Sequence, residues 1–283
     1  MGHGCASAMP HGFPRCQGST MSTILKSWWL VGIVAAILVA NFYVGFVSTG
    51  HSQFASSADV FLGFMGGPLR LLFPLLVALL VCWNAAAELT HRHIAATRPR
   101  IEIRHYIGAK FARGLAGIFA LFFAVGMVTW VCAFVIVPHL YPHAVDPRGY
   151  GLDTAASVFA ATAKQAPLAV LLSHGTLAFG VVASLWLGLN AVVFAAVGLV
   201  AVYILSRPIV ALFVPFGVYI VESIVLQVAG FPGGSFLLSA VYPGGLQSYP
   251  LGQALVPSAV LAALAATAIA ILLATARTNT RFS

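Results

Sequence analysis

Residues 179–228 read FGVVASLWLGLNAVVFAAVGLVAVYILSRPIVALFVPFGVYIVESIVLQV and carry only two charged side chains, one of them Arg207. A membrane-spanning helix needs about 20 consecutive apolar residues, because only a continuous helix satisfies its own backbone hydrogen bonds inside lipid. This stretch is long enough for two such helices. Its one clear break is at Arg207, because the Pro208 that follows ends one helix and begins another. We therefore predict one span over residues 179–205 and the next over residues 208–228.

The composition of the whole chain is that of a protein embedded in lipid. Of its 283 residues, 60% are hydrophobic and 7% are charged, whereas soluble domains carry about 25% charged residues. A surface so poor in charge cannot be kept in water, so we predict an all-α integral membrane protein. The net charge of +8 is explained by membrane topology, as the loops show below, and predicts no nucleic-acid partner.

Four further apolar runs are long enough to cross a bilayer. They cover residues 28–47, 68–87, 114–137 and 256–274. Gly66, Gly67 and Pro68 would break a helix just before the second of these runs. We therefore expect residues 60–67 to form a re-entrant or interfacial turn at the outer side of the membrane.

Two other segments are open to more than one interpretation. We expect residues 166–177 to form a short interfacial helix, but residues 166–205 could instead hold two short spans. The uncharged, Gly- and Pro-rich residues 230–255 could form an outer gate, built as a broken hairpin that enters the membrane. They could equally form a flexible loop.

The positions of lysine and arginine predict which side of the membrane each loop faces, because short cytoplasmic loops carry an excess of both. In a six-span arrangement, one side holds Lys26, Arg92, Arg98, Arg100, Arg104, Lys110, Arg113, Arg207, Arg277 and Arg281. The other side holds only Arg148 and Lys164, with Arg70 near a helix end. We therefore predict six transmembrane helices with both termini in the cytoplasm, since an odd number would place a basic cluster outside.

We expect residues 21–283 to form a single transmembrane domain. Residues 1–20 are rich in Gly, His, Pro, Ser and Cys and contain no apolar run. They are expected to be a disordered leader, or the product of a wrongly assigned start site.

The cysteines and histidines of the chain do not have the spacing of a cofactor site. Cys5, Cys16, Cys82 and Cys132 match neither a disulfide framework nor a zinc motif. His91 and His93 are two residues apart and would lie on different faces of a helix. The sequence therefore predicts no metal, haem or other cofactor in this chain.

The segment from Glu88 to Arg113 lies between the second and third spans and is rich in charge. A short amphipathic helix before Pro99, followed by a second helix that runs into the third span, is its simplest structure. One interpretation is a basic loop that only fixes topology and contacts anionic lipid.

This segment also resembles the first cytoplasmic loop in the permease subunits of type-2 ABC exporters. In that family an acidic residue closes the second span, and a short coupling helix and a basic residue with proline follow. An aromatic residue and a lysine then lead into the third span. Glu88, Arg98 with Pro99, Tyr106 and Lys110 occupy these places in order.

The resemblance implies how such a protein would work. The coupling residues would be Glu88, His91, Arg92, Arg98, Tyr106 and Lys110, although His91-Arg92 stands where the family has a Gly-Thr pair. A cytoplasmic ABC ATPase would grip this coupling helix, and a second permease copy or a homologue would complete the path. The chain contains no G-x-x-x-x-G-K-[ST] phosphate loop, so ATP and magnesium would be bound by the separate ATPase.

Two ionisable residues are expected at membrane depth, where a charge is costly and usually faces a cavity or a partner. Arg70 lies near the outer end of the second span, and Glu222 lies about 20 Å along the fifth span, in the same outer zone. Together with Ser223, they are predicted either to pair or to flank a translocation path. Alternatively, Arg70 reaches the lipid headgroups, and Glu222 is protonated or capped by Ser223.

Three polar residues inside the spans, Asn41, Ser184 and Asn190, are more simply explained by hydrogen bonds between helices than by substrate contacts. The leading hypothesis is an exporter of an apolar or amphipathic substrate in a bacterial plasma membrane. The alternatives are a structural or assembly membrane protein, or an intramembrane enzyme. An enzyme would need convergent carboxylates, histidines or a Ser–His arrangement, and the predicted spans offer one glutamate.

Overall fold

The computed structural model describes residues 19–90, 103–205, 207–244 and 250–275, and these are folded almost entirely into helices. The long helices are α1 (Ser19–His51), α3 (Pro68–Thr90), α5 (Ile103–Val131), α8 (Thr176–Ile204), α10 (Val214–Val228) and α12 (Leu251–Thr275). The short ones are α2 (Ser57–Met65), α6 (Val137–Leu140), α7 (Ala155–Gln165), α9 (Pro208–Ala211) and α11 (Phe236–Ser239). A π-helical turn, Cys132–Ile136, joins α5 to α6. The predicted leader, residues 1–20, lies almost wholly outside the described residues.

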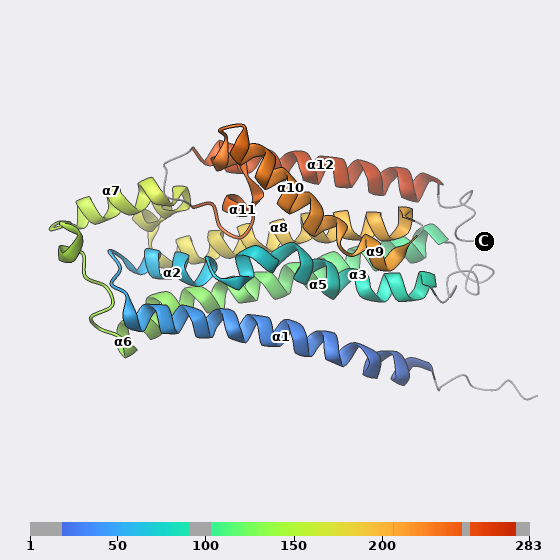
Figure 1. Cartoon of the computed structure of the whole chain (residues 1–283), viewed down its shortest axis with the longest axis horizontal. Coiled ribbons are helices and arrows are strands. Elements are labelled where there is room, and N and C mark those ends of the chain that lie inside the picture. The colour runs from blue at the N-terminus through green and yellow to red at the C-terminus, as the bar shows by residue number, and fades with distance from the viewer. Residues whose placement is uncertain (1–18, 91–102, 206, 245–249, 276–283) are drawn as a thin grey trace, which may run out of the picture.

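Helices α1, α3, α5, α8 and α12 run roughly along one common axis and form an elongated bundle, and α10 crosses it obliquely (Figure 1). Five of these helices are long and apolar enough to cross a membrane, and α2 with α3 makes a sixth candidate that is bent by 49°. The structure therefore confirms a helical, multi-pass membrane protein. The described parts of α1 and α12 begin and end at the same end of the bundle, where α3 also ends and α5 begins. That this end faces the cytoplasm stays a prediction.

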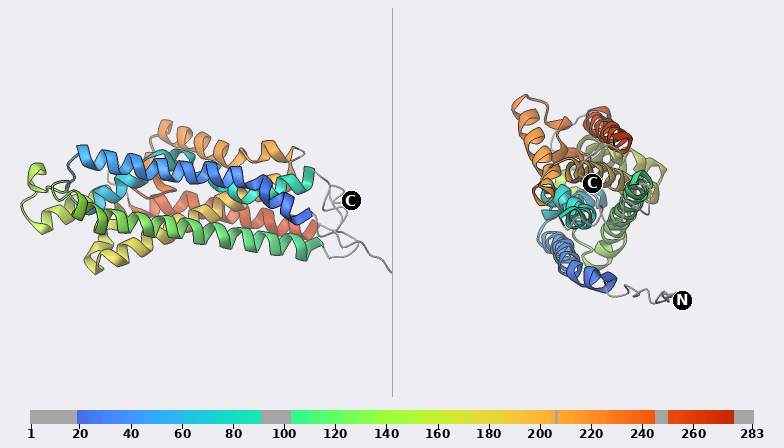
Figure 2. Two further views of the ribbon diagram at one scale, coloured as in Figure 1. Left: turned by 90° about the horizontal axis from the view of Figure 1, so that it is seen from below. Right: turned by 90° about the vertical axis from the view of Figure 1, so that its right-hand side faces the viewer.

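Helix α8 forms the centre of the bundle and packs against α3, α5 and α12. Seen end-on, α1 and α12 lie on opposite sides, and both are largely exposed to the surroundings (Figure 2). Because α8 is a single unbroken helix, the alternative of two short spans over residues 166–205 is wrong. Helix α8 is the most deeply buried of the candidate spans, although Leu185 and Leu189 remain exposed on one side.

The break between α2 and α3 is held by a polar side chain from α1. Asn41 is 2% exposed; its amide nitrogen donates to the Phe64 carbonyl (2.9 Å), and its oxygen accepts from the Leu69 N–H (3.1 Å). These bonds satisfy one backbone group on each side of the break, which would otherwise be unpaired inside the bundle. Helix α3 begins at Pro68, as predicted, but most of residues 60–67 belong to the buried helix α2.

The contact between α5 and α8 depends on glycine. A Cβ atom placed on Gly126 would lie 2.8 Å from the Ser184 Cα, which is closer than real carbon atoms approach. Gly117, on the same helix, has open space where its Cβ would be. The two backbones therefore touch at Gly126, where only glycine fits without a shift of one helix.

Replacing Gly126 with Ala is expected to destabilise the bundle by about 1–3 kcal/mol, because the added methyl group overpacks the α5–α8 contact. Gly117→Ala is the matched control in the same helix, and we expect it to be neutral or slightly stabilising. Thermal unfolding of the detergent-solubilised protein, followed by circular dichroism, measures both. Equal shifts for the two variants would contradict the glycine contact.

Residues 139–176 cover the end of the bundle opposite to the start of α1 and the end of α12 (Figure 1). We call them the outer segment, after the side of the membrane on which they are predicted to lie. The outer segment contains α7, whose first turn is closed by reciprocal hydrogen bonds between Thr154 and Ser157, and a 3₁₀ segment, Pro167–His174, where a short interfacial helix was predicted. The sequence analysis did not predict α7. A backbone bridge between Phe54 and Val145 ties this segment to the start of α2.

Candidate functional site

The residues that follow α10 fold back into the bundle. Helix α11 lies inside it, and Phe236, Ala240, Val241 and Tyr242 are buried in the main apolar core. We call Ser235–Gly244 the inserted segment. It corresponds to part of the predicted broken hairpin in residues 230–255, and it is packed against the core rather than free in solution. Irregular backbone at this depth requires protein groups to satisfy its N–H and C=O groups.

Glu222 and Ser223 of α10 satisfy the N–H groups at the start of α11. The Phe236 N–H donates to Glu222 Oε2 (3.0 Å), and the Leu237 N–H donates to Ser223 Oγ (3.0 Å). Ser223 Oγ also donates to Glu222 Oε2 (3.3 Å), so the two side chains form one unit. The other carboxylate oxygen, Glu222 Oε1, is buried and has no hydrogen-bond partner among the described residues.

Arg70 of α3 satisfies carbonyl groups further along the inserted segment. Its Nε donates to the Leu237 carbonyl, and its Nη2 donates to the Gly244 carbonyl (3.2 Å). The guanidinium group has five fixed donors and suits this bridging of two backbone acceptors. Arg70 therefore fastens the end of the inserted segment to α3.

Two aromatic residues complete this arrangement, and neither was singled out by sequence reasoning. The Trp186 indole N–H of α8 donates to the Ser239 carbonyl (2.7 Å), and the Tyr219 hydroxyl of α10 donates to the Arg70 carbonyl (2.6 Å). A buried Trp or Tyr usually finds a partner for its polar atom, and this is the only signal that could have identified them. We refer to Arg70, Trp186, Tyr219, Glu222 and Ser223 together as the clamp.

The structure thus brings the three predicted path residues to one segment. The hydrogen bonds of the Glu222 carboxylate go to Phe236 and Ser223, whereas those of the Arg70 side chain go to Leu237 and Gly244. Both charged side chains are therefore hydrogen-bonded to the inserted segment. That they also pair with each other or flank a translocation path stays a prediction. The expected cap of Glu222 by Ser223 is present.

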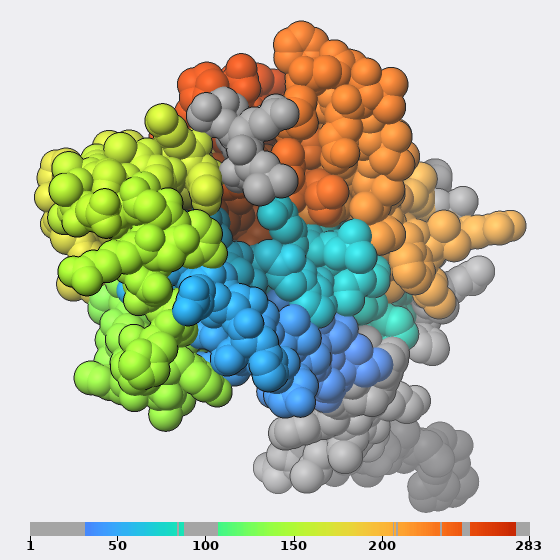
Figure 3. Space-filling view, turned by 60° about the vertical axis from the view of Figure 1, so that its left-hand side comes forward, coloured from blue at the N-terminus to red at the C-terminus, as the bar shows by residue number. Residues whose placement is uncertain are grey.

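Arg70 also borders a hollow that opens towards the outer end. Figure 3 shows a recess between the outer segment, the start of α3 and the orange surface of α10. A hollow of about 240 Å³ in this region is lined by Leu62, Met65, Gly66, Arg70, Gln165, Tyr242 and Gly244. The clamp therefore lies at the boundary between the packed bundle and an opening near the outer segment.

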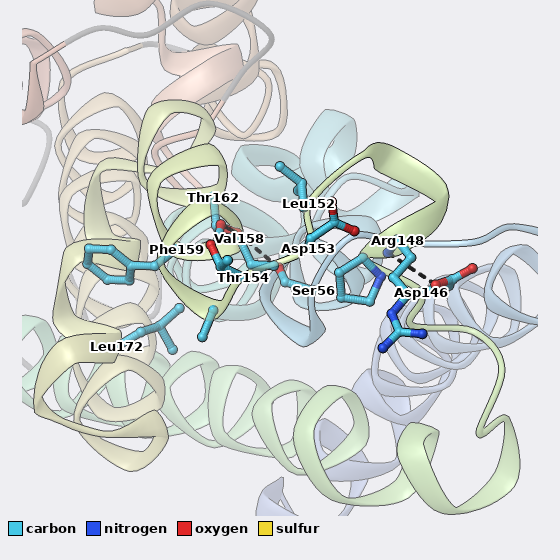
Figure 4. A pocket seen from close by; sticks show the side chains of 12 residues that line it. Ser56, Asp146, Arg148, Leu152, Asp153, Thr154, Val158, Phe159, Thr162 and Leu172 are labelled. Carbon is cyan, nitrogen blue, oxygen red and sulfur yellow. Dashed lines mark hydrogen bonds between the residues drawn. The ribbon is translucent and has the colours of Figure 1, made fainter.

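A second, larger hollow of about 660 Å³ lies within the outer segment and is lined in part by α7 (Figure 4). Its lining residues are Ser56, Asp146, Pro147, Arg148, Leu152, Asp153, Thr154, Ala155, Val158, Phe159, Thr162 and Leu172. It was not predicted from the sequence, because the residues that form it are spread over the outer segment and the start of α2.

The residues predicted to couple to an ATPase lie at the opposite end of the bundle from this hollow. Glu88 is in the last turn of α3, and Tyr106 and Lys110 are in the first turns of α5. His91, Arg92 and Arg98, and most of the predicted coupling helix, lie outside the described residues. The neighbouring part of α5 is firmly packed, since Phe111 stacks on Tyr203 of α8 and belongs to a second apolar core.

The polar residues inside the spans agree in part with expectation. Asn41 joins α1 to the break between α2 and α3, and Asn190 Oδ1 of α8 accepts from Ser258 Oγ of α12 (2.7 Å), so both mediate contacts between helices. Ser184 instead donates to the Gly180 carbonyl of its own helix (2.7 Å), so the expectation for that residue is wrong. A short polar side chain in a helix commonly bonds the preceding turn.

Within the part of the chain that the structure describes, no group of three or more His, Cys, Asp or Glu residues is arranged to hold a metal ion. Cys82 and Cys132 are buried as free thiols. Comparisons with protein-family models, with curated proteins and with solved structures find no match for this chain.

Proposed function

We propose that this chain is the membrane-spanning permease subunit of an ABC exporter, which moves an apolar or amphipathic substrate with ATP hydrolysed by a separate subunit. The observation that carries the proposal is the clamp. Two ionisable side chains from different spans, Arg70 and Glu222, meet one inserted segment deep in the bundle. Ionisable residues at membrane depth typically mark transport pathways, and irregular backbone there lines a cavity or is buried in protein.

The second support for the proposal is the arrangement of the two ends. The basic segment from Glu88 to Arg113 connects α3 to α5 at the end where the described chain begins and finishes. The inserted segment and both hollows lie towards the other end. A partner that pulls on the first end would move α3, which carries Arg70, and would thereby act on the clamp.

In this proposal Glu88, His91, Arg92, Arg98, Tyr106 and Lys110 form the contact with the ATPase. ATP and magnesium are bound by that partner, since this sequence has no phosphate-binding loop. A second permease copy, or a homologue, forms the rest of the path, and the complex lies in a bacterial plasma membrane. The apolar surroundings of Arg70 favour lipid-like, peptide or hydrophobic drug substrates over sugars and ions.

Co-expression with a soluble ABC ATPase encoded by a neighbouring gene tests this function. We expect the two chains to purify together, and ATP hydrolysis to rise roughly fivefold in liposomes, the effect of a coupling free energy of about 1 kcal/mol. The variants Arg98→Glu and Lys110→Glu should abolish this rise. Lys164→Glu, at the opposite end of the helical bundle, is the matched control and should leave the rise in ATP hydrolysis unchanged. Hydrolysis that is unaffected by the wild-type chain would overturn the proposal.

A further inference from the structure

The 660 Å³ hollow in the outer segment has the size of a small-molecule site, since such pockets measure roughly 300–1,000 Å³. The charged and the apolar residues of its lining lie on different sides. Figure 4 shows Asp146, Arg148 and Asp153 on one side, and Phe159 and Leu172 on the other. A ligand that fills this hollow must therefore have a charged part and an apolar part.

The hydroxyl groups between these two sides are already used within the protein. Thr162 Oγ1 of α7 donates to the Val158 carbonyl (2.9 Å) and lies 3.2 Å from Ser56 Oγ. Ser56 Oγ in turn donates to Asp59 Oδ2 at the start of α2 (2.9 Å). The Thr154 hydroxyl accepts from the Ser157 N–H (3.1 Å). The Thr162–Ser56 contact joins α7 to the N-cap of α2, and the Thr154–Ser157 bond closes the first turn of α7. Both hold the walls of the hollow in place before a ligand binds.

Two charges at the hollow are available for a ligand. The Arg148 guanidinium and the Asp153 carboxylate have no hydrogen-bond or ion-pair partner in the described parts of the chain. Asp146 differs, because its Oδ1 accepts from the Arg148 backbone N–H (3.2 Å) and thereby supports the turn. The charged side thus holds one cation, Arg148, and two carboxylates, of which Asp146 also supports the turn. It is complementary to a headgroup that carries both signs.

We infer that this hollow binds a zwitterionic amphiphile of the phosphoethanolamine class. Arg148 contacts its phosphate, Asp153 contacts its ammonium group, and the start of its apolar chain lies against Phe159 and Leu172. A phospholipid of the adjacent leaflet is the source that the surroundings favour. Exposed apolar side chains, among them Leu140, Val170 and Leu177, lie at this end of the bundle and suit the membrane surface. This site is separate from the clamp, and the inference does not depend on transport.

Native mass spectrometry of the full chain in detergent, titrated with two lipids of equal chain length, tests this inference. The probes are dilauroyl phosphatidylethanolamine, which is zwitterionic, and dilauroyl phosphatidylglycerol, which has the phosphate and lacks the amine. We expect the wild-type chain to bind the zwitterionic lipid more tightly. Arg148→Gln should weaken binding of both lipids about tenfold, because both lose the phosphate contact.

The variant Asp153→Asn distinguishes specific binding at this site from a nonspecific effect of surface charge. This variant should lower the affinity for the zwitterionic lipid about tenfold, and it should leave the affinity for phosphatidylglycerol unchanged or raise it. Lys164→Gln, which removes an exposed charge of α7 outside the lining, should change neither affinity. Equal effects of Asp153→Asn on both lipids, or a loss in Lys164→Gln as large as in Arg148→Gln, would overturn the assignment.

The apolar side of the hollow is tested separately. Phe159→Ala should lower the affinity for the dilauroyl lipid severalfold, because it removes part of the wall against which the acyl chain of the lipid lies. Glycerophosphoethanolamine, the same headgroup without chains, should fail to displace the lipid at millimolar concentration. Displacement at concentrations similar to those of the lipid itself would show that the ligand is a free zwitterion, and would overturn the assignment of an amphiphile.

Discussion

Replacing Arg70 with Met is expected to release the inserted segment from the bundle and to expose Ser239 to water. The Arg70 guanidinium donates to the carbonyls of Leu237 and Gly244. Each hydrogen bond to a charged group contributes about 1.5–3 kcal/mol, and methionine can replace neither of them. Opening of the segment should therefore become at least roughly a hundredfold more frequent, since that factor corresponds to about 2.7 kcal/mol.

The rate of alkylation at position 239 measures this opening. Ser239 is fully buried, so a Ser239→Cys variant should react slowly with N-ethylmaleimide while the segment is seated. In the Arg70→Met background the rate should rise at least roughly a hundredfold, and Arg70→Lys, which keeps one donor, should be intermediate. Arg113→Met is the matched control, because the Arg113 side chain bonds a carbonyl of its own helix. An unchanged rate in Arg70→Met would show that Arg70 does not hold the segment.

Glu222→Leu is expected to have the second-largest effect, because it leaves the Phe236 N–H without an acceptor inside the bundle. That bond is made to Glu222 Oε2 at 3.0 Å, while the Leu237 N–H keeps its bond to Ser223. An unpaired buried donor costs about 1–3 kcal/mol, so opening should become at least about tenfold more frequent. The loss is smaller than for Arg70→Met, since Ser223 still holds the start of α11.

The conservative variant Glu222→Gln separates hydrogen bonding from charge. Glutamine keeps an oxygen acceptor for the Phe236 N–H, so its alkylation rate at position 239 should stay within about threefold of the wild type. The double variant Glu222→Leu with Ser223→Ala should open more readily than either single variant, because the Phe236 and Leu237 N–H groups then both lack an acceptor. If Glu222→Gln opened as readily as Glu222→Leu, the carboxylate would act through its charge and not as an acceptor.

The spans could be predicted from the sequence because the length of an apolar run is itself the physical requirement for crossing a bilayer. Residues 208–228 were predicted as one span, and α9 and α10 together cover them with one irregular turn. The start of α3 at Pro68 followed from the inability of proline to continue a helix. The continuity of α8 was left open at its beginning, because residues 166–177 are apolar whether or not they belong to a span.

The outer segment was harder to predict. Helix α7 has only 11 residues, too few to stand out as an apolar run, and its start is marked by the hydrogen bonds between Thr154 and Ser157. The sequence contained that signal as a Thr followed three residues later by a Ser, which is weaker than the usual pair with Glu or Gln. The outer hollow depends on how this segment meets Ser56, and local sequence does not determine such a long-range contact.

The candidate site was predicted only in outline. Arg70 and Glu222 stood out because charged residues are rare and costly at membrane depth. Their arrangement could not be inferred, because a Gly- and Pro-rich segment without charges gives no signal of where it folds. Once Phe236, Val241 and Tyr242 are buried, the backbone between them needs partners, and the nearest polar groups are those of the clamp.

The clamp also limits when its side chains can serve any other purpose. The Glu222 carboxylate and the Arg70 guanidinium are committed to backbone groups of the inserted segment as long as that segment is seated. A molecule recognised by the same atoms would have to displace the backbone, so the two occupants exclude each other. Departure of the segment and arrival of such a guest would then be one exchange reaction, in which the protein supplies its own competing ligand.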